Sequence, residues 1–187
     1  SVSFFSTAAF LGTLFAVPLF LQEGRGVSPL TSGLTVFPEA IGVVTSTQVV
    51  ARVYPRIGPS RLMGIGLVWV AIVMTTLSFM PFDVSLWVFR GLMFALGCGM
   101  ACIFVSNQAA ALGTISRADT GRASMLMSVQ RQIGAAFGVA VISSVLTAIG
   151  LFDGLEPNHR AYQIAFLTAA GIALVGAALS VQVPDKD

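Results

Sequence analysis

The chain has 187 residues, of which 56% are hydrophobic and only 10% are charged, and its formal net charge is +2. A soluble domain has about 25% charged residues, so this composition excludes a water-soluble globular protein, which would expose large apolar patches. The basic residues do not gather into the patch that nucleic acids require, so we expect a lipid bilayer around the chain and no nucleic-acid partner.

Six long apolar segments follow one another, each close to the roughly 20 residues that a helix needs to cross a bilayer. Strands of a membrane barrel would be about ten residues long and would alternate in polarity, and these segments do not. We therefore predict an all-α polytopic transmembrane helix bundle that fills residues 1–187 as one domain. Its spans are expected at about residues 3–21, 31–51, 62–80, 84–106, 121–149 and 161–183.

The second segment contains an acid, Glu39, about eight residues from its start, or roughly 12 Å deep at the helical rise. An ionisable group at such depth is costly and usually marks a functional site. Its carboxyl could exchange a proton as a pocket opens to each side, or attract a cation. The alternative is a structural carboxylate that pairs with a residue outside this chain. Pro38 removes a backbone hydrogen bond just before it and is expected to kink the helix.

Small residues recur at one-turn spacing in the fourth and fifth segments. They are Gly91, Ala95 and Gly99 in the fourth segment, followed by Gly134 and Gly138 in the fifth. Such stripes let two helix backbones approach closely. We interpret them as helix-packing positions, and a seam along which two helices slide is the alternative.

Basic residues in the short loops predict the orientation of the bundle. One side has six of them, whereas the other side has three, so we expect the first side and the C-terminus to be cytoplasmic. The six are Arg52, Arg56, Arg61, Arg117, Arg122 and Lys186, and the three are Arg25, Arg90 and Arg160.

The residues that enzymes and metal sites need are scarce and scattered. His159 is the one histidine, and Cys98 and Cys102 lie one helical turn apart in an apolar run. No cluster has the spacing of metal ligands, and there is no P-loop, dinucleotide motif or Ser-His-Asp order. We therefore expect no enzyme, no cofactor and no metal.

Two stretches resemble a known family. Residues 51–61 read ARVYPRIGPSR and resemble the cytoplasmic loop motif G-x-L-x-D-R-x-G-x-R-R of the major facilitator superfamily. Arg56, Gly58 and Arg61 match this motif, whereas Ala51 and Pro55 replace its Gly and Asp. Residues 121–140, from GRAS to RQIGAAFGVA, are similar to the fourteen-span drug:H⁺ antiporter branch of that family.

The resemblance implies that this chain is the C-terminal six-helix half of a secondary transporter in a bacterial inner membrane. Its partners would be the missing N-terminal half of the same chain, a small-molecule substrate and protons. The first and fourth segments would line the central cavity, the second and fifth would face the other half, and the third and sixth would face lipid. The whole protein would export small lipophilic, cationic compounds in exchange for protons.

Three more polar residues are candidates for the substrate or proton pathway. Arg90 either snorkels to the outer interface or pairs with Glu39, and Asn107 ends the fourth segment near an inner vestibule. Arg131 either snorkels to the cytoplasmic interface or contacts the other half as a gate. The first alternative is an exporter or uniporter of one metabolite without proton coupling. The second is a membrane-embedded scaffold or enzyme, although an enzyme should show clustered His, Asp or Glu at a membrane face and the acids here are scattered.

Overall fold

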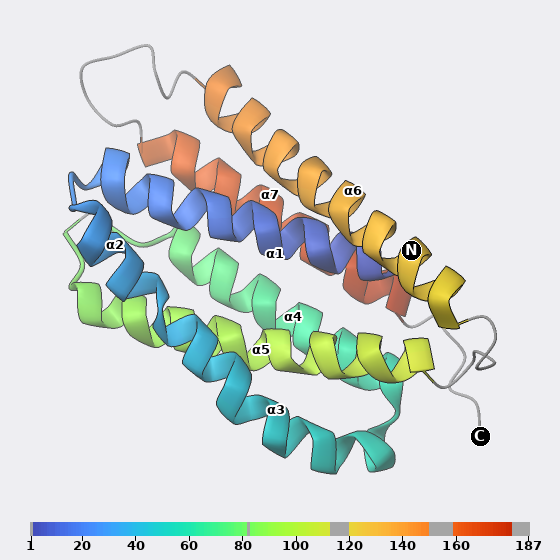
Figure 1. The fold of residues 1–187 in the computed structure, drawn as a ribbon. Helices are drawn as coiled ribbons and strands as arrows, with labels where there is room; N and C mark the ends of the chain where they lie inside the picture. Colours follow the sequence, from blue (N-terminus) through green and yellow to red (C-terminus); the bar gives the residue numbers. More distant parts are fainter. Residues whose placement is uncertain (1, 82, 113–119, 150–158, 181–187) are drawn as a thin grey trace.

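The computed structural model describes residues 2–81, 83–112, 120–149 and 159–180, and these are almost entirely helical (Figure 1). Within these ranges there is no strand, and six helical spans are long and apolar enough to cross a membrane. The structure thus confirms the predicted all-α bundle of six spans.

Two of the six spans are interrupted helices. The first consists of α1 (Val2–Leu19) and a π-helical turn (Phe20–Gly24), and the second consists of α2 (Pro29–Val36) and α3 (Pro38–Ile57). The break between α2 and α3 lies at the predicted kink, because proline has no N–H to continue the helical ladder. The other spans are α4 (Pro59–Ser78), α5 (Leu86–Leu112), α6 (Thr120–Ala148) and α7 (His159–Ser180).

The second span begins slightly earlier than the sequence analysis predicted. The Ser28 hydroxyl accepts a hydrogen bond from the Thr31 N–H at 3.3 Å, and Pro29 occupies the first helical turn. A serine cap followed by proline is a strong helix start. At the other end of the chain, residues 181–183 of the predicted sixth span lie outside the described residues.

The helices pack side by side in the order α6, α1, α7, α4, α5 and α3. Successive spans run in opposite directions (Figure 1). The ends of α3 and α5 therefore lie with the starts of α1, α4 and α6, and we call this the Gly58 end. The end of the first span and the start of α2 lie at the opposite end, which we call the Gly24 end.

Glycines set the closest helix contacts. A methyl group at Gly97 of α5 would meet the Glu39 carbonyl of α3, and one at Gly42 of α3 would meet the Phe94 carbonyl of α5. Only glycine lets these two backbones come so close, as in other membrane bundles. The contact fixes the start of α3, and with it Glu39, against α5.

The predicted small-residue stripes agree with the structure only in part. Gly134 and Gly138 lie against the backbone of α1, and Gly99 lies against Gly66 of α4. Gly91 is different, because a methyl group there would meet no atom within 4 Å. No described helix covers Gly91, which is on an exposed face of α5, so its packing role stays a prediction.

The turn between α3 and α4 depends on Gly58. Its backbone has φ 85° and ψ 159°, and its N–H donates to the Tyr54 carbonyl at 3.0 Å. This region of backbone space is essentially restricted to glycine. The matched glycine of the loop motif is therefore required by the geometry of the turn.

Candidate functional site

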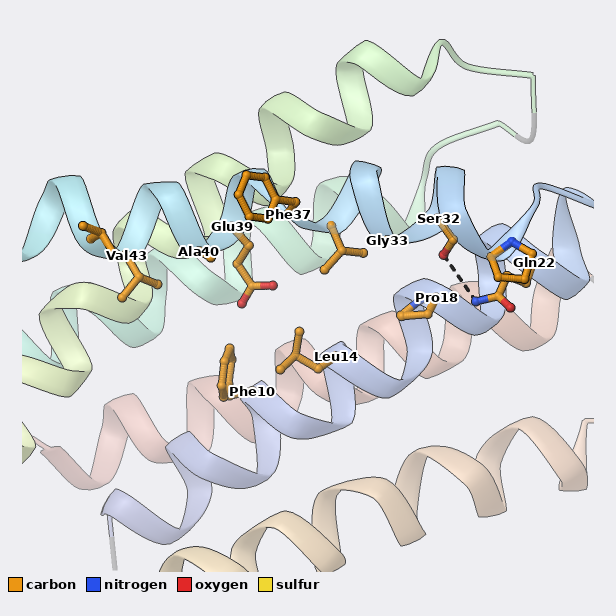
Figure 2. Close-up of a pocket in the computed structure, with 13 residues that line it drawn as sticks. Phe10, Leu14, Pro18, Gln22, Ser32, Gly33, Phe37, Glu39, Ala40 and Val43 are labelled. Carbon is orange, nitrogen blue, oxygen red and sulfur yellow. Dashed lines mark hydrogen bonds between the residues drawn. The ribbon is translucent and has the colours of Figure 1, made fainter.

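A cavity of about 620 Å³ lies between the first span and the second span (Figure 2). Most of its lining is apolar, as is usual for small-molecule sites. Three polar side chains, Gln22, Ser32 and Glu39, interrupt that lining. The apolar part is formed by Phe10, Leu14, Pro18, Pro29, Gly33, Val36, Phe37, Ala40, Val43 and Val44.

Regular helical spacing builds the wall that α1 contributes. Phe10, Leu14 and Pro18 follow each other at four-residue intervals, and residues with this spacing share one helix face. All three side chains point toward α2 and α3 in Figure 2. Proline also removes an N–H donor from the end of α1, and the helix continues from there as the π-helical turn that contains Gln22.

Glu39 is the acid of the site. It lies in the first turn of α3, its exposed fraction is 4%, and its carboxylate points into the cavity toward Phe10 and Leu14 (Figure 2). Because the second span begins at Pro29, Glu39 is about 15 Å from the start of that span. A hydrocarbon core is about 30 Å thick, so a span that entered it at Pro29 would hold the Glu39 side chain near its middle.

No hydrogen bond or ion pair to the Glu39 carboxylate is formed by the residues that the structure describes. A buried charge normally pairs with another group or binds a ligand. The unpaired carboxylate can therefore bind a proton or a cation that enters the cavity.

A second polar group closes the cavity toward the Gly24 end. The Gln22 Nε2 atom donates to the Ser32 Oγ atom at 3.4 Å, which joins the π-helical turn to α2 (Figure 2). Ser32 is almost completely buried, with an exposed fraction of 1%. Neither residue was predicted from the sequence, because an amide and a hydroxyl near helix ends are common. The sequence feature that could have indicated them is their position near the irregular ends of the first span and of α2, in segments that are otherwise apolar.

The other predicted pathway residues do not gather around Glu39. The Arg90 guanidinium lies 4.5 Å from the centre of the Trp87 ring, so its suggested pairing with Glu39 is not formed. Asn107 accepts a hydrogen bond from the Ser3 hydroxyl at 2.7 Å, which ties α5 to α1 near the Gly58 end. Arg131 is exposed on α6.

The loop-motif residues are also remote from the cavity. Arg56, Gly58 and Arg61 lie at the turn from α3 to α4, and both arginine side chains are exposed. Within the described ranges, no group of three or more His, Cys, Asp or Glu residues is able to hold a metal ion. The candidate site is therefore the cavity with its acid and its polar end.

The helices that line the cavity differ in part from those that the resemblance implied. α1 contributes as expected, but the opposite wall comes from α2 and α3 rather than from α5. The reason is the close contact at Gly42 and Gly97, which places α5 behind α3. The second span thus holds the acid of the site.

Comparisons with known proteins give a consistent result. The family model described as Major Facilitator Superfamily matches residues 1–187. The chain is 31% identical over 94% of its length to a lincomycin resistance protein of Streptomyces lincolnensis, covering 35% of that protein. It is 30% identical over 96% of its length to the multidrug efflux pump LfrA of Mycolicibacterium smegmatis, again covering 35% of the relative. The chain thus spans about a third of the length of these curated relatives.

Proposed function

Because this chain belongs to the Major Facilitator Superfamily, we propose that it is the C-terminal half of a proton-coupled transporter that exports small lipophilic, cationic compounds. The names of its relatives, which refer to multidrug resistance and efflux, support export of drug-like compounds. The observation that supports the proposal best is Glu39, a buried acid that lines an apolar cavity and whose carboxylate has no partner among the described residues. Apolar walls favour lipophilic compounds, and the carboxylate favours a positive charge.

Coupling in this proposal follows from competition for one carboxylate. Glu39 binds either a proton or the cationic group of the substrate. When the cavity opens to the outside, a proton displaces the substrate from the carboxylate. When the cavity opens to the cytoplasm, a new substrate displaces that proton. One substrate therefore leaves for each proton that enters at this site.

Alternating access requires a second bundle, and the surface of this chain supports one. The second span and α6 have the smallest buried shares of the six spans. α6 also exposes a row of large apolar side chains at helical spacing, Leu126, Val129, Ile133 and Phe137. These surfaces suit contact with the N-terminal half, against which the bundle would rock around a site near mid-membrane.

The orientation of the bundle belongs to the same proposal. Arg52, Arg56 and Arg61 lie at the Gly58 end, and the excess of basic residues in short loops favours the cytoplasmic side. We place the Gly58 end in the cytoplasm and the Gly24 end outside. The Gln22–Ser32 pair then lies between Glu39 and the outside.

The direct test is efflux from bacteria that express the full-length parent. Cells are loaded with a fluorescent lipophilic cation, and its loss is followed with and without a protonophore. We expect efflux faster than in vector controls, and we expect the protonophore to abolish the difference. Efflux that persists without a proton gradient would contradict the coupling and favour an uncoupled exporter. No efflux of several such cations would contradict the substrate class.

A further inference from the structure

We propose that the cavity selects two-headed substrates, with a cationic group at one end and a hydrogen-bonding polar group at the other end of an apolar body. Glu39 would bind the cation, and Gln22 with Ser32 would bind the polar group. The inference rests on the proposed export of lipophilic cations. It adds which members of that class bind best, and it assigns Gln22 and Ser32 as specificity residues.

The two polar ends of the cavity are well separated. Glu39 and Ser32 are seven residues apart along the second span, or about 10 Å at the helical rise. Leu14 and Pro18 lie between them on the opposite wall (Figure 2). A ligand that reaches from one end to the other must therefore have an apolar middle.

The middle of the cavity has room for that apolar body. Gly33 faces it from α2, and a methyl group added at Gly33 would meet no atom within 4 Å. Helix interiors normally disfavour glycine by about 1 kcal/mol relative to alanine. The open space beside Gly33 can therefore hold the apolar body of a ligand.

The polar end retains unused hydrogen-bonding capacity. The Gln22–Ser32 bond, at 3.4 Å, is longer than the usual 2.9–3.0 Å for an N–H···O bond. A glutamine amide has two N–H donors and a carbonyl acceptor, and a serine hydroxyl both donates and accepts. Within the part of the chain that the structure describes, neither side chain has another hydrogen bond. A ligand hydroxyl or amide can bond to both residues.

A purely structural role makes a different prediction. If the Gln22–Ser32 bond only held α1 against α2, its loss would weaken binding of every ligand by the same factor. If it recognises a polar group, its loss weakens only the ligands that have such a group. The ratio of two dissociation constants separates these cases.

The test uses two probes, octyltrimethylammonium and its ω-hydroxy analogue, and the purified full-length parent. Calorimetry gives the Kd of each probe for wild type, Gln22→Leu, Ser32→Ala and the control Thr76→Val. Thr76 is exposed on α4, and its hydroxyl donates to the Ile72 carbonyl of its own helix at 2.9 Å. Binding at equilibrium needs no proton gradient. The ratio of the two dissociation constants can therefore be measured even if transport is not coupled to protons.

We expect the ω-hydroxy probe to bind about fivefold more weakly to Gln22→Leu and to Ser32→Ala, the factor of one net hydrogen bond. The unhydroxylated probe should bind all four proteins equally, which also shows that the variants are folded. An equal loss for both probes, an unchanged ratio in both variants, or no binding of either probe to the wild type would overturn the proposal. Glu39→Gln should weaken both probes by the same factor.

Discussion

Replacing Glu39 with glutamine in the full-length parent removes a negative charge but keeps the size and shape of the side chain. The exposed fraction of Glu39 is 4%, and the residue lines the cavity between α1 and α3. Because no described residue bonds its carboxylate, the substitution breaks no ion pair among these residues. Any change in binding therefore reports the interaction of the carboxylate with a ligand or a proton.

The size of the effect follows from the charge that is lost. At an effective dielectric constant of about 20, two opposite unit charges about 5–10 Å apart attract each other by about 1.7–3.3 kcal/mol, which corresponds to about 15- to 230-fold in Kd. We expect Glu39→Gln to weaken binding of the permanent cation tetraphenylphosphonium by a factor in this range. The apolar walls should retain part of the affinity, because they do not depend on the charge.

The pH dependence gives a second measure. A proton and the cation compete for Glu39, so lowering the pH should weaken binding to the wild type by up to about tenfold per pH unit. In Glu39→Gln the site has no proton to exchange, and Kd should not change with pH. Calorimetry with the purified parent at several pH values measures both quantities.

Glu23→Gln provides the matched control, because Glu23 is an exposed acid of the π-helical turn and does not line the cavity. It should keep the affinity and the pH dependence of the wild type. If Glu39→Gln binds tetraphenylphosphonium as tightly as the wild type and with the same pH dependence, the Glu39 carboxylate binds neither the cation nor the competing proton.

Three further substitutions test the packing of the site. Gly33→Leu should raise the melting temperature in detergent, since leucine favours a helix by up to about 1 kcal/mol over glycine, while filling the cavity and weakening cation binding. Gly97→Ala should lower the free energy of unfolding by about 1–2 kcal/mol and weaken cation binding, because its methyl group meets the Glu39 carbonyl. Gly58→Ala should lower the free energy of unfolding by about 1–3 kcal/mol, measured by thermal melting, because its φ is 85°.

Gly171→Leu is the control for Gly33→Leu, and a specific result would contradict each of the three predictions. Gly171 also has open space around it but lies on α7, outside the cavity, so Gly171→Leu should stabilise the protein and leave binding unchanged. If Gly33→Leu binds tetraphenylphosphonium normally, that cation does not occupy the middle of the cavity. Unchanged melting of Gly97→Ala or Gly58→Ala would show that the tight contact or the turn relaxes without cost.

Local sequence predicted the helices well, for a physical reason. Apolar length decides whether a segment crosses a bilayer, and this property is read within each segment. The breaks at Pro38 and Gly58 were likewise visible, because proline and glycine act on their own backbone. The start of α2 was also marked locally, by the Ser28 cap and Pro29. It was missed because the start of the span was predicted from apolar residues alone.

The acid of the site was predictable for the same kind of reason. Glu39 is an isolated charge deep in an apolar segment, and such a charge is costly unless it has a function. Its neighbours were not predictable in this way. Gln22 and Ser32 belong to different spans, and nothing in either segment indicates that the two side chains meet. Arg90 was a reasonable partner by charge, yet it stacks on Trp87.

The contacts between helices could not be predicted from the sequence. The regular stripe pointed to Gly91, whereas the tightest contact of α5 with α3 is at Gly97, on another face of α5. Spacing along one helix identifies a face but not the helix that will cover it. Only the packing of all six spans against one another placed α5 behind α3, and with it the Glu39 carboxylate in a cavity that faces α1.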